Sequence, residues 1–212
     1  MKINKEIAEI TGLLIGDGCL SKYRSYNANR LEIAFTGHLK EYRYYKEFVK
    51  PIFIKYFNVK GTLRIRNEDT STRYHIKSIK AFNYFKNIGV QIGEKEIVEL
   101  PPIIKQKPYI WIAFIRGLFD AEGSIYRRYS KKYKNHTRIY DNLLVAQIKF
   151  NCSKEFIKFI EHVLITNKIK TNRITKIGKS YIIRITKQES IEKFLDIFKP
   201  KIKNAPFDKR AY

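Results

Sequence analysis

Two acidic residues, Asp17 and Glu122, stand in closely similar surroundings. They lie in the segments ITGLLIGDG (residues 10–18) and IRGLFDAEG (residues 115–123), and a glycine follows each acid. The matched positions are 105 residues apart, about half of the chain, and this spacing indicates a duplicated unit. Two symmetric carboxylates could hold divalent cations, and such cations stabilise the attacking and leaving oxygens when a phosphodiester is cleaved.

The residues before each acid predict how the two carboxylates are brought together. Small residues stand four positions apart in both copies, as Gly12 and Gly16 in the first and as Gly117 and Ala121 in the second. Positions four apart share one face of a helix, so the missing side chains let two helices approach closely. The glycine after each acid predicts a helix end with a left-handed backbone. If the helices pack side by side, both acids lie at the same negative dipole ends, where bound cations would relieve the repulsion.

The segments after each motif repeat one order of elements. Strands are predicted near 19–26, 30–35, 61–66 and 72–77 in the first half, and near 124–129, 143–150, 171–177 and 181–186 in the second. Helices are predicted over 39–57 with an interruption at Pro51, over 81–89 with a stop at Gly89, over 153–168 with Ser153 as the N-cap, and over 189–199. We therefore predict an α+β fold of two pseudo-twofold-related αββαββα units, with the motif helices packed at the centre and two antiparallel sheets.

Prolines mark the boundary between the two units. Three of the six prolines fall in ELPPIIKQKP, just before the second motif, and they exclude a continuous helix or a central strand there. We assign residues 1–99 to the N-terminal half, 100–108 to a linker and 109–212 to the C-terminal half.

Charge and composition restrict the class of partner. The 212 residues include 43 Lys and Arg against 20 Asp and Glu, for a formal net charge of +23, and 44% of the residues are hydrophobic. The chain can therefore build a core, and its charge favours a polyanionic partner, with nucleic acid ahead of a membrane surface. No apolar run is long enough to span a bilayer, and the N-terminus has no signal-peptide pattern. Two cysteines are too few for a disulfide scaffold, so we expect an intracellular protein without a membrane partner.

The predicted strands concentrate positive charge on one face. Alternate side chains of a strand point to opposite faces, so Arg64 and Arg66 would face outward together. Arg and Gln on such a face can recognise base edges in the major groove, and Lys contacts phosphate. A solvated sheet face is also polar, but the excess of positive charge favours double-stranded DNA. The candidate DNA contacts are Arg24, Arg30, Arg64, Arg66, Arg73, Lys77, Tyr126, Arg128, Arg138, Gln147, Lys149 and Arg184.

The two motifs and their spacing resemble those of LAGLIDADG homing endonucleases in the single-chain, two-motif form. The resemblance covers nearly the whole chain. It implies a monomer whose sheets form a saddle over DNA, and cleavage of both strands at a long asymmetric target with short 3′ overhangs. It also implies Mg²⁺ as the cofactor, Mn²⁺ as a substitute, and Ca²⁺ as an ion that supports binding with little cleavage. The implied metal ligands are Asp17 and Glu122, with the carbonyls of Gly16 and Ala121.

The resemblance implies further catalytic residues. GEKEIVELPP resembles the family's lysine-containing segment before the linker, which selects Lys95, and IFKPKIKNAPFDKR resembles the C-terminal counterpart, which selects Lys209. The positions of the family's pocket residue fall on Gly37 and Asn151. Asn151 can orient a water molecule, whereas glycine cannot. Asp120 is expected to be a structural residue at the helix end.

Two other functions compete with the endonuclease. An RNA-binding splicing cofactor, or maturase, occurs in the same family and would have intron RNA as its partner, but loss of an acid would have favoured it and both acids are present. A basic nucleic-acid-binding protein without catalysis predicts no symmetric carboxylates. The resemblance also implies an intron-encoded protein, which we expect in the cytoplasm of a prokaryote or archaeon rather than in an organelle.

Overall fold

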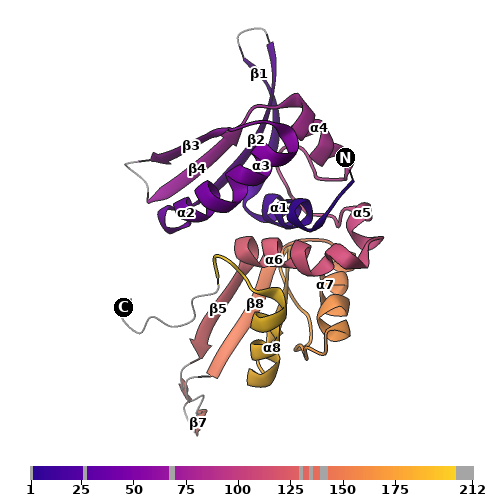
Figure 1. The fold of residues 1–212 in the computed structure, drawn as a ribbon. Helices are drawn as coiled ribbons and strands as arrows, with labels where there is room; N and C mark the ends of the chain where they lie inside the picture. The colour runs from indigo at the N-terminus through magenta and orange to yellow at the C-terminus, as the bar shows by residue number, and fades with distance from the viewer. Residues whose placement is uncertain are drawn as a thin grey trace.

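The computed structural model describes residues 2–25, 28–66, 70–128, 131–133, 136–138 and 143–203. These residues form two halves of the same design, one above the other in Figure 1. Helices α1 (Lys5–Gly16) and α6 (Trp111–Glu122) lie side by side between the halves and form their main contact.

Each half contains one four-stranded antiparallel sheet. In the N-terminal half, α1 is followed by β1 (Gly18–Ser25), β2 (Ala28–His38), a helical run, β3 (Thr62–Arg66), β4 (Ser71–Ile76) and α4 (Ile79–Asn87). In the C-terminal half, α6 is followed by β5 (Gly123–Arg128), β8 (Leu143–Asn151), α7 (Lys154–Thr166), β9 (Thr175–Ile177), β10 (Ser180–Ile185) and α8 (Gln188–Phe198). The sheet orders, β1-β2-β4-β3 and β5-β8-β10-β9, are the same. The predicted α+β fold of two repeated units is confirmed.

Two details of the C-terminal sheet differ from the prediction. A small hairpin, β6 (Lys131–Tyr133) and β7 (His136–Arg138), stands between β5 and β8. The strand expected over 171–177 covers only Thr175–Ile177, and Asn172 continues the contact by donating its N–H to the Arg184 carbonyl (2.7 Å). Ser153 caps α7 as expected, because its hydroxyl accepts a hydrogen bond from the Phe156 N–H (3.3 Å).

Pro51 does not interrupt the helix before β3. The helical run passes from a 3-10 turn (Leu39–Glu41) through α2 (Tyr42–Tyr44) and a π-helical segment (Tyr45–Val49) into α3 (Lys50–Phe57). Proline lacks an N–H and its ring crowds the preceding turn, and the wider π turn directly before Pro51 accommodates that ring. A change of helix type therefore replaces the expected break.

The small residues bring the backbones of α1 and α6 into contact, as predicted. A Cβ atom on Gly12 would lie 2.1 Å from the carbonyl oxygen of Phe114, and one on Gly117 would lie 1.9 Å from that of Glu9. A Cβ on Gly16 would lie 2.3 Å from the Cβ of Ala121. No larger side chain fits at these positions without separating the helices.

The glycines after the acids serve a different purpose from the predicted one. Gly123 has φ −85 and ψ 162, and the glycines with positive φ in the described ranges are Gly61, Gly89, Gly93 and Gly178. Gly18 and Gly123 each begin a strand that returns against the last turn of the helix. A Cβ on Gly123 would lie 2.4 Å from the Phe119 carbonyl oxygen, and one on Gly18 would lie 2.7 Å from the Leu14 Cα. The prediction of left-handed caps is wrong, and close packing explains the glycines.

The segment between the halves is folded and tied to both. It contains the single turn α5 (Pro102–Lys105) and a 3-10 turn (Pro108–Ile110), each of which begins with a proline. Upstream of it, the Val98 N–H donates to the Asn151 carbonyl (3.0 Å) and the Ser153 N–H donates to the Val98 carbonyl (3.0 Å). The last residues of the N-terminal half therefore lie against the C-terminal sheet.

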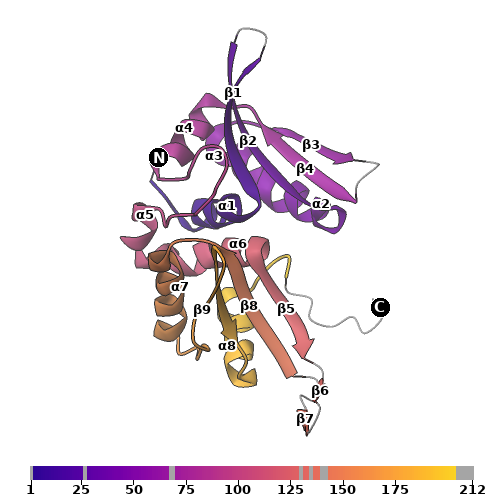
Figure 2. The same ribbon diagram turned by 180° about the vertical axis from the view of Figure 1, so that it is seen from behind.

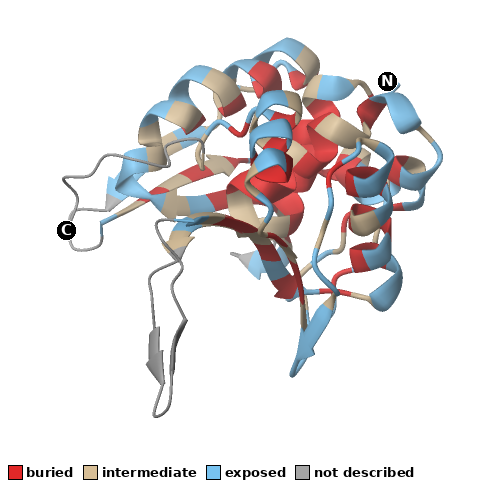
Figure 3. Ribbon diagram, turned by 90° about the horizontal axis from the view of Figure 1, so that it is seen from below, coloured by how far each residue is buried: buried red, intermediate tan, exposed pale blue. Residues whose placement is uncertain are grey.

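The described helices pack on one side of the two sheets. Figure 2 shows the strands from the side opposite to Figure 1, and Figure 3 shows the buried residues gathered around the central helices. The helix-facing side of each sheet supplies buried residues, such as Phe35 and Tyr74 in the N-terminal half and Ile148 in the C-terminal half. Side chains on the other side, including Thr36, Arg64 and Lys149, are exposed. Among the described helices, none is long and apolar enough to cross a bilayer.

Candidate metal centre and nucleic-acid interface

The two motif acids lie together at the ends of the central helices. Asp17 is the C-cap of α1 and Glu122 is the last residue of α6. Burial raises the pKa of each carboxyl to about 6, and for Glu122 the charge of Asp17 adds to the increase. The prediction that the packed helices bring both acids to one end is thus confirmed, and this end is unfavourable for two negative charges.

Lys95 lies beside both acids and closes the end of α1. Its ammonium group donates to the carbonyl oxygens of Leu14 (2.7 Å), Ile15 (2.7 Å) and Gly18 (2.6 Å). Burial lowers the pKa of Lys95 to about 8, although the nearby acids oppose the decrease. This lysine satisfies carbonyls that the helix leaves free, and it brings a positive charge next to Asp17 and Glu122.

Asp120 fixes the segment after α8 against the central helices. Its buried carboxylate accepts hydrogen bonds from the backbone N–H groups of Lys201 (2.9 Å), Ile202 (2.8 Å) and Lys203 (3.2 Å). The structural role expected for Asp120 is therefore confirmed. The segment that it holds brings Lys203 close to both motif acids, where its positive charge partly offsets the rise of their pKa values.

The sequence did not indicate Lys203 as a site residue. The C-terminal lysine selected there is Lys209, which lies outside the described residues. Lys203 supplies a second positive charge near both acids, in addition to that of Lys95. The signal for it is indirect, since it depends on recognising that the buried Asp120 would bind the backbone of a segment 81 to 83 residues later.

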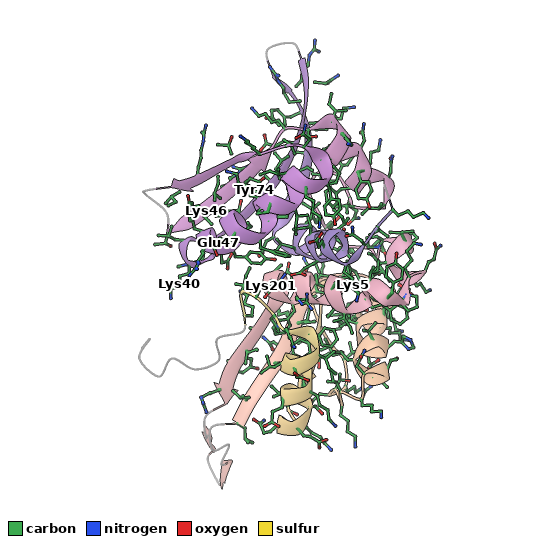
Figure 4. All side chains as sticks on the ribbon, in the orientation of Figure 1. Lys5, Lys40, Lys46, Glu47, Tyr74 and Lys201 are labelled. Carbon is green, nitrogen blue, oxygen red and sulfur yellow. The ribbon has the colours of Figure 1, made fainter. Side chains whose placement is uncertain are left out.

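A buried ionic network supports this arrangement. Glu9 of α1 is 3% exposed, accepts a hydrogen bond from Arg116 of α6 (3.0 Å) and forms an ion pair with Lys201 (2.7 Å). The ammonium group of Lys201 also lies 3.1 Å from the centre of the Phe48 ring, and Figure 4 shows Lys201 between the halves. The network joins both central helices to the C-terminal segment, and no motif in the sequence pointed to it.

The donor atoms at the seam, where the ends of α1 and α6 meet, suit a hard divalent cation. Asp17 and Glu122 supply carboxylate oxygens, which Mg²⁺ and Ca²⁺ prefer, and their raised pKa values show that their charges lack sufficient compensation from the protein. Within the described part of the chain, no group of three or more acidic, His or Cys side chains could hold a metal ion alone. The remaining ligands would therefore come from backbone carbonyls, water and a bound phosphate.

A cavity of about 340 Å³ lies on the Glu122 side of the seam. Its lining includes Glu122, Lys95, Asn151 and Ser180. The Ser180 hydroxyl donates to the side-chain oxygen of Asn151 (2.6 Å), which leaves the Asn151 amide group free to donate. This is the arrangement expected of a residue that orients water.

Strand register identifies the counterpart of Asn151 in the other half. The first strand residue after each acid pairs with the second strand of its sheet, Gly18 with Phe35 and Gly123 with Ile148. Three residues further on, the second strands end at His38 and Asn151, which pair with Ser71 and Ser180. Gly37, selected from the sequence, is one residue too early and faces the helices. The exposed His38 is the equivalent position, so the assignment of Gly37 is corrected.

Among the described residues, the open face of the N-terminal sheet is basic but contains one acid. Register places Arg30, Arg64 and Arg73 on this face, and Lys77 follows the end of β4. The candidate contact Arg24 pairs with Asn29 and lies on the opposite side of the sheet from Arg30, so it is not part of the open face.

Glu32 is the acid of this face, and the sequence did not indicate it. The Tyr23 hydroxyl donates to it (2.9 Å), and it contacts Nδ1 of His75 (2.5 Å) and Arg73 (3.9 Å). A carboxylate in a basic sheet can accept from cytosine.

The open face of the C-terminal sheet is organised around Gln147. Its side-chain oxygen accepts from Arg184 (3.2 Å) and from the Tyr126 hydroxyl (3.5 Å), while Lys149 is exposed beside it. The predicted face is therefore present, with polar groups different from those of the N-terminal sheet. The side chains of Arg66, Arg128 and Arg138 lie outside the described residues, although their backbones belong to β3, β5 and β7.

Comparison with known proteins agrees with this geometry. Residues 111–199 match the family model of the LAGLIDADG-like domain. Over 119 residues the chain is 34% identical to the homing endonuclease I-DmoI of Desulfurococcus mucosus, and the match covers 55% of each chain. An uncharacterised protein of Methanocaldococcus jannaschii is 25% identical over 209 residues, which is 96% of this chain and 22% of that protein. The chain thus spans about half and about a fifth of these relatives.

The fold matches that of I-DmoI in complex with DNA and Mn, with a TM-score of 0.65 and 23% identity over 92% of this chain and 96% of that one. Other matching I-DmoI structures contain DNA with Ca, or target DNA with Mg in a variant. The expected resemblance is confirmed: residues 111–199 match the LAGLIDADG-like family model, and the chain has the fold of I-DmoI over 92% of its length. These relatives give no support to the maturase alternative.

Proposed function

We propose that this chain is a site-specific double-strand DNA endonuclease of the homing type. The observation that carries the proposal is the placement of Asp17 and Glu122 at the seam between two sheets with open, polar and mainly basic faces. The net charge of +23 favours association with DNA over most other partners. One chain supplies both acids and both faces, so the active form is a monomer.

The residues at the seam divide the work of phosphodiester hydrolysis. Asp17 and Glu122, with the carbonyls of Gly16 and Ala121, would hold Mg²⁺, or Mn²⁺ in its place. A bound cation stabilises the attacking and leaving oxygens of the phosphodiester. Lys95 and Lys203 place positive charge where the phosphate enters, while Lys209 stays a prediction from the sequence. Asn151 and His38 offer donor or acceptor groups that orient water, one in each half.

The two faces imply an asymmetric target. The N-terminal face presents Arg64 and Arg73 with Glu32, and the C-terminal face presents Gln147, Lys149 and Arg184. Different donors and acceptors recognise different base edges, so each half binds its own half of a long site. We infer cleavage of both strands across the seam, with short 3′ overhangs.

Cleavage of the chain's own insertion site tests this function. The substrate is a plasmid that carries the gene's flanking sequences joined without the insert, incubated with the full chain and Mg²⁺ or Mn²⁺. We expect linear product, tight binding without product in Ca²⁺, and loss of product when a chelator is present. Protein with Asp17→Asn, purified in parallel, controls for contaminating nuclease. If the wild type binds this DNA but produces neither a nick nor a linear form in any of these metals, the endonuclease proposal is wrong.

A further inference from the structure

Two buried polar atoms below the end of β2 have no hydrogen-bond partner among the described residues. They are Oε2 of Glu41 and the hydroxyl oxygen of Tyr45, and Tyr45 is completely buried. Gly37 is what makes room for them, because a Cβ atom there would lie 2.0 Å from Oε2 and 2.7 Å from the hydroxyl. Buried polar atoms normally have partners, so an unpaired carboxylate oxygen and an unpaired hydroxyl in one small space indicate a missing ligand.

This space adjoins Asp17. The Thr36 N–H, one residue before Gly37, donates to the Asp17 carbonyl (3.3 Å), which fixes the end of β2 against the end of α1. The charge of Glu41 contributes to the raised pKa of Asp17, after burial, and the charges of Asp17 and Glu41 both act on Tyr45. Lys203 is the cation that faces both acids. The Asp17 half therefore contains a second carboxylate that family resemblance did not indicate.

The Glu122 half shows no second carboxylate among the described residues of its cavity. Its cavity is lined by Lys95 and Lys149, and Glu122 is the one acid among the described residues that line it. Lys95 is held by the carbonyl oxygens of Leu14, Ile15 and Gly18 at the end of α1, so its charge is fixed near both motif acids. Lys95 and Lys203 act on both motif acids, so the difference between the two sides is Glu41: an approaching cation meets two carboxylates at Asp17 and one at Glu122.

We propose that Glu41 is an auxiliary acid that makes the Asp17 half the stronger binder of divalent cations. The proposal rests on the proposed function only in placing metal at the motif acids. A unit charge within a few ångströms of a doubly charged ion at a partly buried site changes the affinity by about tenfold or more. Glu41 acts on the cation directly or through a water that its free oxygen and the Tyr45 hydroxyl hold. One consequence is that the strand cut by the Asp17 half needs less metal than the strand cut by the Glu122 half.

Metal binding to the free protein tests the proposal without any cleavage. Mn²⁺ alone is titrated into the full chain, and free Mn²⁺ is followed by electron paramagnetic resonance. We expect a tighter and a weaker site, with the tighter site lost in Asp17→Asn and kept in Glu122→Gln. Glu41→Gln should weaken the tighter site by about tenfold. Gly37→Ala should do the same while every charge is retained, because its methyl group displaces the Glu41 carboxylate.

Glu47→Gln is the matched control. Glu47, labelled in Figure 4, lies on the same helical run as Glu41, and both residues line one surface groove. The exposed carboxylate of Glu47 is paired with Arg43 (2.9 Å). This variant should bind Mn²⁺ as the wild type does. Thermal melts confirm that each protein is folded. If one of the variants at positions 37 and 41 does not fold, the other still tests the proposal. Wild-type Mn²⁺ affinity in both folded variants, or loss of the tighter site in Glu122→Gln, would overturn the proposal.

Strand-resolved cleavage separates this proposal from the endonuclease function. Duplex labelled differently on each strand is cut over a series of Mn²⁺ concentrations, and we expect half-maximal cutting of the two strands to differ by about tenfold. Glu41→Gln should bring the two curves together. If Mn²⁺ binds unequally as described but no strand is cut, the endonuclease function fails and the unequal binding stands. If both strands are cut with the same metal dependence in the wild type, the role of Glu41 fails and the endonuclease function stands.

Discussion

The two halves share one scaffold but differ around their acids. Their sheets have the same strand order, and each acid ends a central helix directly before a strand. The Asp17 half adds Glu41 and His38 and the Glu122 half adds Asn151, while Lys95 and Lys203 act on both acids. The parts where backbones touch are therefore alike, and the parts where side chains border open space differ.

This difference shows which positions the duplication can change. At Gly12 and Gly117 any side chain would collide with the opposite backbone, so symmetry there is required by packing. At the ends of β2 and β8 the side chains are exposed, and no packing constraint prevents a histidine in one half and an asparagine in the other. A repeated fold can therefore place two unequal sites at one seam.

Removal of the motif acids should have the largest effect. Asp17→Asn and Glu122→Gln retain size but lose the charge that holds a cation, so cleavage of the cognate duplex should fall by about 10³-fold or more. Binding in gel shifts should be equal or tighter, since less negative charge opposes the phosphates. If the halves are unequal, the two variants should first lose cleavage of different strands. Wild-type rates in both variants would show that the acids are not catalytic.

The contact between the central helices gives the next largest effect. A side chain at Gly117 collides with the Glu9 carbonyl, so Gly117→Leu should lower the free energy of unfolding by about 3 kcal/mol or more. Urea titration followed by circular dichroism measures the loss. Gly178→Asn is the control, because Gly178 has φ 58 in open space and asparagine tolerates that backbone. An unchanged midpoint for Gly117→Leu would contradict the close packing of α1 and α6.

Asp120 belongs to the C-terminal half but serves the Asp17 side. Its carboxylate holds the backbone of Lys201 to Lys203. An asparagine would keep one accepting oxygen but lose the negative charge, and its NH2 group would replace the oxygen that also accepts from the Lys201 N–H. Asp120→Asn should therefore cost about 2 kcal/mol of stability and release Lys203 from the seam. Cutting by the Asp17 half should slow more than cutting by the Glu122 half. Equal slowing of both strands would show that the segment supports the whole seam rather than one side.

Much of this organisation could be predicted from the sequence, and the failures share a physical cause. The duplicated motif contains the packing rule for α1 and α6, and the alternation of Arg64 with apolar neighbours gives the open sheet face, because both depend on local periodicity. Glu41, Lys203 and the network of Glu9 depend on contacts between segments far apart in the chain, which no local pattern records. Gly37 was selected instead of His38 because register along β2 is set by pairing with β1 and β4, not by the residues of β2 alone.

The pH dependence of stability compares the acids without any DNA. Both pKa values rise to about 6 in the folded protein, above the ordinary values of 3.8 for Asp17 and 4.5 for Glu122. The folded state thus binds more protons than the unfolded state between about pH 4 and 6, and stability falls as pH rises through this window. In chelator at pH 7.5, the double variant Asp17→Asn, Glu122→Gln should be more stable than the wild type by about 1–2 kcal/mol. Equal stability at pH 4 is the internal control, and a wild type that is more stable at pH 7.5 would contradict the assignment.

The open faces offer the smallest effect and the sharpest separation of the halves. Arg64 is exposed on the N-terminal face and Arg184 lies on the C-terminal face beside Gln147, so each alanine variant should weaken binding by about 1 kcal/mol. If the arginine recognises a base, the loss of specificity should be confined to the half-site of its own sheet. Lys22→Ala removes the same charge from the helix-facing side of β1 and should leave the sequence preference unchanged. Binding to a panel of single-base variants of the target, measured at two salt concentrations, distinguishes the cases. A uniform loss of affinity over the panel with a shallower salt dependence would assign the arginine to a phosphate contact. If Arg64→Ala and Arg184→Ala changed the preference in the same half-site, the assignment of one sheet face to each half-site would be wrong.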